Sequence, residues 1–356
     1  MAKLKKGLIP LVALLYLVAF GFFIWGVAAG SYKIFPWKQM ATVYDELHAF
    51  FTFQGGTHTS AQDKIVLDRQ EKRTEYNFTG FRLRDPGFQD TGYLLISRYS
   101  KKHKQVIAEL FSIASNKVLH TWMPSQSEIF EKSKDMETNV TRDLASFAIQ
   151  HPVLLKDGDL VFNTEQGPLV RIDACGNTVW VIARHFHHSI EIDSNRNIVT
   201  CIVADAQIPE TIYPIRDDGI AIVSLEGDIL KEYSITESLL NNGYSGLVYG
   251  VGLFEEDRIH LNDAQPILKP SVDADVGDIA LSIRNLSTVT LFSPHQGEIK
   301  WLKTGPWLNQ HDISQSGDGS YSIFGNDIAR NSENGGRYVN DDRSEVYIGC
   351  SGVKKT

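Results

Sequence analysis

Four segments of the sequence repeat one pattern, and this repetition limits the possible folds more than any other feature. Each segment contains an apolar strand, a turn that carries Gly or Asn, and a second strand that ends in an aromatic residue. The segments are AELFSIASNKVLHTW ending at Trp122, PLVRIDACGNTVW ending at Trp180, IAIVSLEGDILKEY ending at Tyr233 and VTLFSPHQGEIKW ending at Trp301. The pattern predicts four β-hairpins of one kind.

A second repeated segment, which begins with histidine, precedes some of these hairpins. It reads HPVLLKDGDLVF from His151, HHSIEIDSNRNIV from His187 and HDISQSGDGSYSIF from His311. Together the two repeats give four strands in a unit of about 40 to 50 residues, which is typical of a β-propeller blade. A β-sandwich is the competing all-β architecture, but it does not predict this recurrence.

The repeating units do not fill a complete ring. They begin near Tyr93, His151, His188, His260 and His311. The last unit runs through SYSIFGND and EVYIG and has no second hairpin that ends in an aromatic residue. An open sheet edge is costly, so we expect either that the propeller lacks its last blade or that residues 53–92 supply the closing strands.

The amino terminus predicts a membrane anchor. Lys3, Lys5 and Lys6 precede an uncharged run from Gly7 to Tyr32, which is long enough to span a bilayer as one helix. The lysines place the amino terminus in the cytoplasm and the rest of the chain beyond the membrane. We therefore expect a single-pass inner-membrane protein with its propeller in the periplasm. A cleaved signal peptide is the alternative, but its apolar core is usually shorter.

These signals divide the chain into four expected parts. Residues 1–32 form the anchor or signal segment, and residues 33–92 a connecting segment with a short helix near residues 41–51 and some strands. Residues 93–348 form the propeller, and residues 349–356 a tail. The formal net charge of −8 argues against a basic nucleic-acid surface, so we expect no nucleic-acid partner.

Histidines recur at comparable positions of the repeating units. His188, His260 and His311 stand at the starts of their units, and His151 is a candidate fourth member. First strands of propeller blades line the central channel, so these side chains are expected to converge there. His188, rather than its neighbour His187, matches the position of His311 in the repeat.

Arg284 adds a positive charge to the same expected site. It lies within the apolar strand pattern GDIALSIRNLSTV, where a charge needs a partner or a ligand. Three histidines could instead hold zinc, but an arginine in the same channel would repel the cation.

These residues together resemble the bacterial arylsulfotransferase family. The resemblance covers about residues 90–348 and rests on four motifs in order: HHSIEID, HLNDAQ, LSIRN and NQHDISQSGDGSYSIFGN. The sequence departs from the family pattern at Asn285, where family members often have His. It also departs in a lengthened His260–Arg284 interval that includes LKPSVDADV, and in its short carboxyl end.

The resemblance implies a six-bladed propeller that transfers a sulfuryl group from an aryl sulfate to a phenolic acceptor. It implies that His311 is the nucleophile that becomes transiently sulfated in a ping-pong reaction, with His188, His260 and Arg284 around it. No cofactor and no metal are expected. The alternative from another functional class is a noncatalytic, membrane-anchored propeller that binds a protein or ligand in the periplasm.

Overall fold

The computed structural model describes residues 14, 16–28, 87–100, 102–136, 147–164, 166–204, 215–251, 257–326, 328–330, 337–339 and 345–349. The chain divides into two compact units, residues 1–77 and residues 78–356. Within the first unit, residues 16–28 are helical. None of the described helices is long and apolar enough to cross a membrane. The membrane span expected over residues 7–32 stays a prediction.

Several sequence predictions fall outside the described residues. They are the short helix near residues 41–51, the KIVLDR and GFRLRD segments expected to complete the ring, and the tail from residue 350 onward. The boundaries expected for the connecting segment and the propeller also stay predictions. The first described strand, β1, begins at Tyr93.

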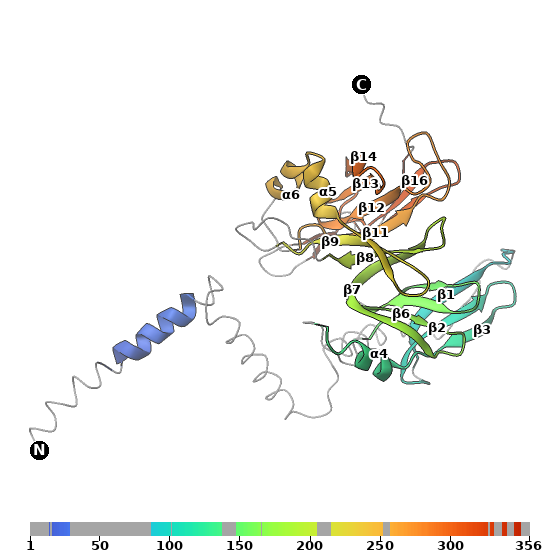
Figure 1. Ribbon diagram of the computed structural model, residues 1–356, viewed down its shortest axis with the longest axis horizontal. Helices are drawn as coiled ribbons and strands as arrows, with labels where there is room; N and C mark the ends of the chain where they lie inside the picture. Colours follow the sequence, from blue (N-terminus) through green and yellow to red (C-terminus); the bar gives the residue numbers. More distant parts are fainter. Residues whose placement is uncertain are drawn as a thin grey trace, which may run out of the picture. The chain divides into compact units, whose positions relative to one another are not determined.

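The largest sheet of the second unit has seven antiparallel strands in the order β10-β9-β8-β7-β6-β5-β4 (Figure 1). Its strands are β4 (Gln150–Leu154), β5 (Leu160–Asn163), β6 (Gly167–Ile172), β7 (Thr178–Ile192), β8 (Ile198–Val203), β9 (Asp218–Val223) and β10 (Ile229–Ser234). The long strand β7 pairs with β6 through its first part and with β8 through its second part. The sheet therefore consists of two four-stranded groups, β4–β7 and β7–β10, that share one strand.

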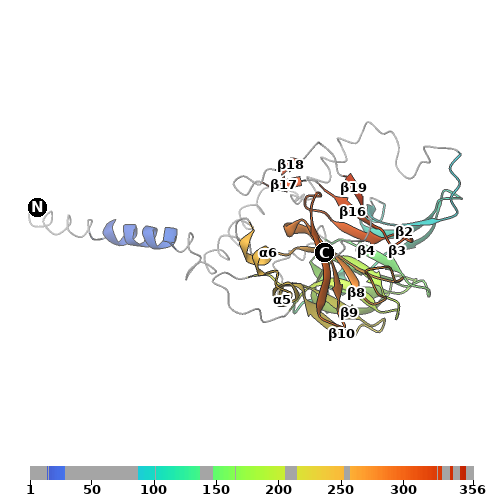
Figure 2. The same ribbon diagram turned by 90° about the horizontal axis from the view of Figure 1, so that it is seen from above.

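The remaining sheets are smaller, and each is antiparallel. The first holds β1 (Tyr93–Ser100), β2 (Gln105–Ser112) and β3 (Lys117–Trp122), and the next holds β11 (Leu261–Pro266), β12 (Ile279–Ile283), β13 (Thr288–Ser293) and β14 (Glu298–Thr304). The last three-stranded sheet holds β15 (Asp312–Gln315), β16 (Tyr321–Gly325) and β19 (Glu345–Gly349), while β17 (Ile328–Arg330) and β18 (Arg337–Val339) form a separate ribbon (Figure 2).

Short helices connect some of these strands. They are α4 (Gln126–Lys132), α5 (Ile235–Asn241), α6 (Ser245–Gly250) and the 3₁₀ turn η1 (Arg284–Leu286). Helix α5 begins at the Ser234 cap, whose side chain accepts a hydrogen bond from the Glu237 amide at 2.9 Å. A serine at this position satisfies one of the amides that the first helical turn leaves unpaired.

The four hairpins predicted from the repeat are confirmed as β2–β3, β6–β7, β9–β10 and β13–β14. The segments that begin with histidine are confirmed as β4–β5, β7–β8 and β15–β16. Alternation of apolar and polar residues, broken by turn residues, thus located the strands correctly. The expected four strands per unit are present in the β4–β7, β7–β10 and β11–β14 groups.

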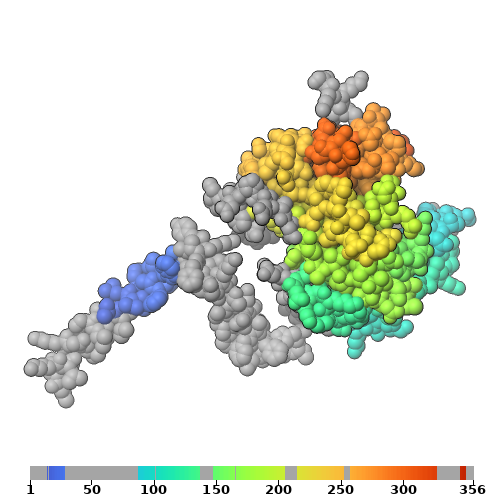
Figure 3. Space-filling model, in the orientation of Figure 1, coloured from blue at the N-terminus to red at the C-terminus, as the bar shows by residue number. Residues whose placement is uncertain are grey.

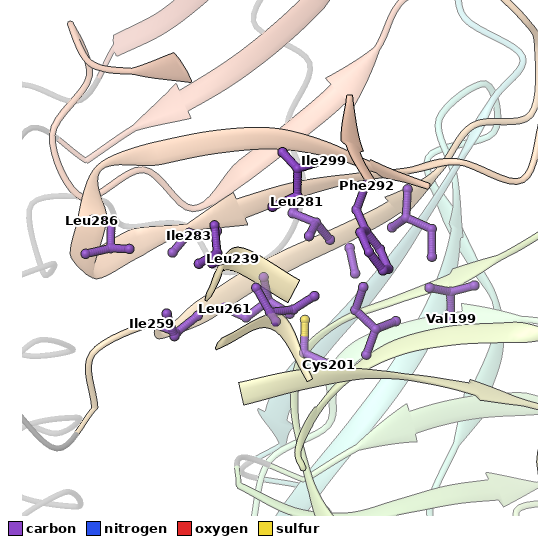
Figure 4. Close-up of a cluster of buried hydrophobic side chains, with 14 of the residues drawn as sticks. Val199, Cys201, Leu239, Ile259, Leu261, Leu281, Ile283, Leu286, Phe292 and Ile299 are labelled. Carbon is purple, nitrogen blue, oxygen red and sulfur yellow. The ribbon is translucent and has the colours of Figure 1, made fainter. Parts of the chain in front are cut away.

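The sheets pack on one another through apolar faces. One core joins the β7–β10 group to the β11–β14 sheet, with Cys201, Leu261, Leu281 and Phe292 among its buried side chains (Figure 4). Separate cores join the first sheet to β5 and β6, and the β11–β14 sheet to β15 and β16. In Figure 3 the described residues of these successive sheets lie directly beside one another on the face in view. Burial of these faces supplies the main stabilising free energy of the unit.

Two of the aromatic residues that end the repeated hairpins, Trp122 and Trp180, bind neighbouring turns of other strand pairs. The indole N–H of Trp122 donates to the Gly158 carbonyl at 3.1 Å, and that of Trp180 donates to the Leu225 carbonyl at 2.9 Å. Gly227 has a φ of 96°, and a Cβ there would lie 3.0 Å from the Trp180 ring. Only glycine suits this turn, because it must adopt a left-handed conformation and lie directly against the indole.

The predicted all-β class is confirmed as a set of several antiparallel sheets. The first and last of these sheets, β1–β3 and β15–β16–β19, have three strands each. In the part of the chain that the structure describes, no strand pairs with both of them, so no closed ring of sheets is seen.

Candidate active site

The predicted histidines stand at the starts of three strand groups. His188 lies within β7, where the β7–β10 group begins, and His260 and His311 come directly before β11 and β15. The backbone of His188 has a φ of 55° and that of His260 a φ of 48°. His151, at the corresponding position of the β4–β7 group, has a φ of 44°. Positive φ is uncommon for a residue other than glycine and often marks a functional position.

Each of these left-handed residues coincides with an irregularity in strand pairing. The register shifts between Gln150 and Val153, between His187 and Ile190, and between Leu261 and Asp263. A bulge re-aims the side chains next to it. This backbone distortion recurs at three equivalent positions and re-aims His188 and His260, which come from two different sheets. No such distortion is found at His311.

Three of the four predicted site residues lie together. The ring centroid of His188 is 5.2 Å from that of His260 and 6.1 Å from that of His311. His188 is therefore the central member of an imidazole group assembled from three strand groups. We call His187, His188, His260 and His311 the histidine cluster. The chemical roles assigned to these residues stay predictions.

The structure distinguishes His187 from His188. His187 is 1% exposed, and its Nδ1 lies 2.9 Å from Nδ1 of His188. Its Nε2 faces Oδ1 of Asp218 at 3.5 Å. His188 meets the other two histidines, whereas His187 lies behind it. The assignment of His188, rather than His187, to a shared catalytic site stays a prediction.

Polar partners hold the backbone of His188 in place. Its amide donates to Oε1 of Gln150 at 3.1 Å, and its carbonyl accepts from Nδ2 of Asn163 at 3.0 Å. Both partners belong to the preceding strand group. They anchor a left-handed residue that would otherwise relax.

His260 and His311 each have a polar partner at Nδ1. Oδ2 of Asp257 lies 2.5 Å from Nδ1 of His260. The side-chain amide of Asn326 contacts Nδ1 of His311. Because these contacts engage Nδ1 and set the orientation of each ring, chemistry at either imidazole would use Nε2.

Arg284 belongs to the same segment as His260. Its amide donates to the His260 carbonyl at 3.1 Å, and the residue is 5% exposed. Its guanidinium Nη1 donates to Oδ1 of Asn285 at 2.8 Å, and Nδ2 of Asn285 donates to the carbonyl of Asp257. Asn285, the position that departs from the family pattern, thus links Arg284 to the residue that pairs with His260.

The lengthened interval between His260 and Arg284 lies at the far end of its hairpin. Strands β11 and β12 are antiparallel, with Leu261 opposite Ile283, so His260 and Arg284 lie at one end of the pair. Residues 267–278, which include the LKPSVDADV segment, connect the strands at the other end. The added residues therefore lie at the end of the hairpin away from His260 and Arg284.

Several polar residues of the site were not found from the sequence. Arg216 places Nε 3.1 Å from Oδ1 of Asp218 and Nη1 3.9 Å from Oδ2 of Asp257. It therefore connects the carboxylate behind His187 with the carboxylate that pairs with His260. The only sequence signal was RDDG, the paired acids of Arg216–Gly219 at the start of a strand. Short acidic runs of this kind are usually turns.

Burial and neighbouring histidines shift the pKa of His188 strongly. Burial is the largest cause, followed by the positive charge that His187, His260 and His311 can carry, and together they lower the pKa of His188 to about 2. Buried imidazoles favour the neutral form. His188 is therefore neutral across the physiological pH range.

A second group of titratable side chains lies on the same strands. Burial, reinforced by Asp312, raises the pKa of Glu191 on β7 to about 7. Burial also raises the pKa of Asp263 on β11 to about 8, against a hydrogen bond that its Oδ2 accepts from the Ile313 amide at 3.0 Å. We call Glu191, Asp263 and Asp312 the carboxyl layer. The sequence did not reveal the carboxyl layer, because each of the three acids taken alone resembles an ordinary polar residue of a strand.

Zinc binding finds no geometric support at this site. Among the described residues, no three His, Cys, Asp or Glu side chains are arranged to hold a metal ion.

Comparison with known proteins identifies a family for most of the second unit. Residues 151–348, more than half of the 356-residue chain, match the arylsulfotransferase (ASST) family. No curated protein matches the chain. Similar solved structures include a protein of unknown function from Bacteroides caccae, with a TM-score of 0.39, 12% identity and coverage of 66% of this chain and 70% of that chain. Another is the WD40 β-propeller domain of Doa1, with a TM-score of 0.38, 10% identity and coverage of 66% and 58%.

Proposed function

The chain belongs to the arylsulfotransferase (ASST) family, as its motifs predicted, and on this premise we propose that it transfers a sulfuryl group from an aryl sulfate to a phenolic acceptor through a sulfated His311. The observation that carries the proposal is the convergence of His188, His260 and His311 from three strand groups. A nucleophile, an acid and a base are needed for such a transfer, and imidazole supplies each of them.

The first half-reaction breaks the bond between sulfur and the aryl oxygen. Nε2 of His311 attacks sulfur with its lone pair, and the electron pair of the breaking bond leaves with the aryl oxygen. His260 is the candidate acid that protonates this oxygen, because Asp257 engages its Nδ1 and leaves Nε2 for the reaction. Arg284 is the candidate for holding the sulfuryl oxygens, since a guanidinium offers a planar set of donors.

The second half-reaction returns the nucleophile. The oxygen of the acceptor phenol attacks sulfur, the bond between sulfur and Nε2 of His311 breaks, and that nitrogen recovers its lone pair. The phenol proton passes to a nearby imidazole, for which neutral His188 is the candidate base.

Asn326 sets the orientation that the nucleophile needs. Nε2 of neutral His311 carries the lone pair only when the ring proton is on Nδ1. The amide of Asn326 meets this requirement when its oxygen faces Nδ1 and accepts that proton. Which atom of an asparagine amide faces a partner is assigned from the hydrogen-bond network, and the proposed reaction selects the oxygen.

The test of this proposal is intact-mass analysis of the purified full chain after mixing with 4-nitrophenyl sulfate, together with release of nitrophenol with and without added phenol. We expect a sulfuryl adduct and phenol-dependent turnover. His311→Asn should abolish the adduct and lower turnover at least ~10³-fold, since loss of a covalent nucleophile removes the two-step route. The matched control is His295→Asn, because His295 lies exposed in the β13–β14 turn, and this variant should behave like the wild type.

A folded protein that forms no adduct and releases no nitrophenol from several aryl sulfates would contradict the proposal. The noncatalytic binding propeller would then be the better explanation, and it predicts that His311→Asn is tolerated. An adduct that persists in His311→Asn would also contradict it, by moving the nucleophile to another residue.

Closure of the sheets into a six-bladed ring forms part of the proposal. It is supported by the repeated four-stranded groups and by the histidines that stand at equivalent positions of successive groups. An experimental structure of the full chain in which the first and last sheets share a hydrogen-bonded strand would establish the ring. Two sheets that end in unpaired edges would exclude it.

Attachment to the inner membrane with the second unit in the periplasm is likewise proposed. It is supported by the basic flank and the long uncharged run of residues 7–32. Cell fractionation with carbonate extraction should find the full chain in the membrane and a variant without residues 1–32 in the soluble fraction. Equal partition of the two proteins would contradict the anchor.

A further inference from the structure

Behind His188 lies a buried pair of residues to which the proposed reaction gives no role. His187 is 1% exposed and Asp218 is fully buried, and both stand on strands of the seven-stranded sheet. His187 contacts His188 through Nδ1 at 2.9 Å and faces Asp218 through Nε2 at 3.5 Å. The three side chains thus form a line that runs from the protein interior to the centre of the histidine cluster.

Asp218 carries its negative charge in the folded protein. Burial opposes ionisation, but His187 and the Arg216 guanidinium outweigh it and hold the pKa of Asp218 below its usual range. Oδ1 lies 3.1 Å from Nε of Arg216, and Oδ2 accepts a hydrogen bond from the Leu261 amide at 2.8 Å. An ionised carboxylate can only accept hydrogen bonds.

The charge of Asp218 is already balanced by Arg216. A second ring proton on His187 would bury another cation next to His188. The arrangement of lower charge gives His187 one ring proton. Since Nε2 faces the carboxylate, that proton belongs on Nε2, and Nδ1 has a lone pair.

The tautomer of His187 determines which ring nitrogen of His188 has the proton. Between the two Nδ1 atoms at 2.9 Å, one must donate and the other accept. Because Nδ1 of His187 accepts, Nδ1 of His188 donates. A neutral imidazole has one proton, so Nε2 of His188 presents a lone pair.

The geometry points to His187 and Asp218 as a positioning pair that holds His188 in its Nδ1-protonated tautomer, so that Nε2 of His188 accepts the proton of the attacking phenol. The tautomer of His188 is inferred only from the contacts described above. The use of His188 as a base rests on the proposed function. A carboxylate that fixes the tautomer of a histidine base can matter greatly: in serine proteases, changing the Asp that orients the histidine base to Asn lowers kcat about 10⁴-fold.

Asp218→Asn is the most direct test, because it exchanges an acceptor for a group that can donate. The introduced amide N–H can donate to Nε2 of His187, which moves the ring proton of His187 to Nδ1 and reverses the hydrogen bond to His188. We expect the phenol-dependent step to fall about 10²–10⁴-fold. Formation of the sulfuryl adduct, which does not use His188 as a base, should change by no more than about tenfold.

A pair of substitutions at His187 tests the same inference if Asp218→Asn fails to fold. His187→Asn retains a side-chain oxygen close to the position of Nδ1, which can accept the His188 proton. His187→Leu removes the acceptor while keeping an apolar side chain of moderate size. We expect the phenol-dependent rate of His187→Asn to exceed that of His187→Leu by at least ~10-fold.

The tautomer itself can be measured independently of turnover. In the full chain labelled with ¹⁵N-histidine, long-range proton–nitrogen correlation spectra distinguish the protonated from the unprotonated ring nitrogen, with the His188 signals assigned by their loss in His188→Asn. We expect protonated Nδ1 in the wild type and protonated Nε2 in Asp218→Asn, with the His295 signals unchanged. Protonated Nε2 in the wild-type His188 would overturn the inference.

Measurements of turnover and of the His188 tautomer distinguish failure of the proposed sulfuryl transfer from failure of the positioning pair. An inactive protein with the expected tautomer would contradict the proposed function and support the positioning pair. An active protein in which Asp218→Asn slows both half-reactions equally, with no change of tautomer, would contradict the positioning pair alone.

Discussion

The histidine cluster and the carboxyl layer use the same strands but respond to burial in opposite directions. His188 and Glu191 are three residues apart on β7, and His260 and Asp263 are three residues apart at the start of β11. Burial lowers the pKa of His188 to about 2, so this base stays unprotonated. Burial raises the pKa of Glu191 to about 7 and that of Asp263 to about 8, so these acids retain protons near neutrality.

His188, Glu191 and Asp263 therefore all favour their uncharged forms. The cause is shared, since the charged form of either group is poorly solvated in the interior. Neutral carboxyls matter for the proposed function because an aryl sulfate is an anion, and protonated carboxyls next to its site repel it less than carboxylates would. The opposite directions of the two pKa shifts lead to predictions whose signs differ between the two regions.

The largest expected effect comes from His260, which has Asp257 at its Nδ1. Asp257→Asn should lower turnover about 10²–10³-fold, because it removes the carboxylate that engages Nδ1 and orients the ring of the proposed acid. The loss should grow with the pKa of the departing phenol, since a poorer leaving group needs more protonation. The measurement is kcat/KM for a series of substituted phenyl sulfates.

A loss from Asp257→Asn that is equal for all leaving groups would contradict the role of His260 as acid. The control is Asp173→Asn. Asp173 is half-buried, and its Oδ1 accepts hydrogen bonds from the amides of Cys175 and Asn177 in its own turn, so its replacement should not alter the leaving-group dependence.

The carboxyl layer should make the protein less stable as pH rises. Glu191 and Asp263 have raised pKa values in the folded state, so the folded protein binds their protons more tightly than the unfolded chain does. Their contribution is fully present below about pH 4 and is lost as pH rises through about 7 for Glu191 and about 8 for Asp263. The free energy of unfolding should fall by roughly 1 kcal/mol per pH unit for each titrating carboxyl in this window.

Urea unfolding between about pH 5 and about pH 8 checks this dependence. The double variant Glu191→Gln, Asp263→Asn cannot ionise at these positions, and the introduced amide oxygen can still accept from the Ile313 amide. Its unfolding free energy should depend less on pH than that of the wild type. Equal pH dependence in both proteins would show that the two carboxyls titrate normally.

Sequence reasoning predicted the strands, and it selected three histidines that the structure brings together, because both depend on local patterns. Alternation of residue type located the hairpins, and the repeat placed His188, His260 and His311 at equivalent positions. The left-handed backbone of His188 could not be predicted, because the same letters also fit a regular strand. Asp218 and Arg216 were missed for a different reason: they reach the cluster from β9 and the residues before it, and this pairing depends on how the sheet folds rather than on any local spacing.

The smallest expected effect is the acid response of His188. Its lowered pKa means that the unfolded chain binds a proton more tightly than the folded protein. Its contribution to stability is therefore present above about pH 6.5 and is lost as pH falls toward 2, with a slope of at most ~1.4 kcal/mol per pH unit. This dependence has the opposite sign to that of the carboxyl layer.

His188→Asn isolates this contribution, because asparagine tolerates the left-handed φ of 55° at this position. Urea unfolding from about pH 6 down to about pH 4 should show a weaker loss of stability in this variant than in the wild type. His295→Asn removes an exposed histidine and should leave the dependence unchanged. If the unfolding free energies of His188→Asn and the wild type fall equally with decreasing pH, His188 is protonated in the folded protein over this range. The pKa of His188 would then not be shifted in the direction opposite to the pKa values of Glu191 and Asp263.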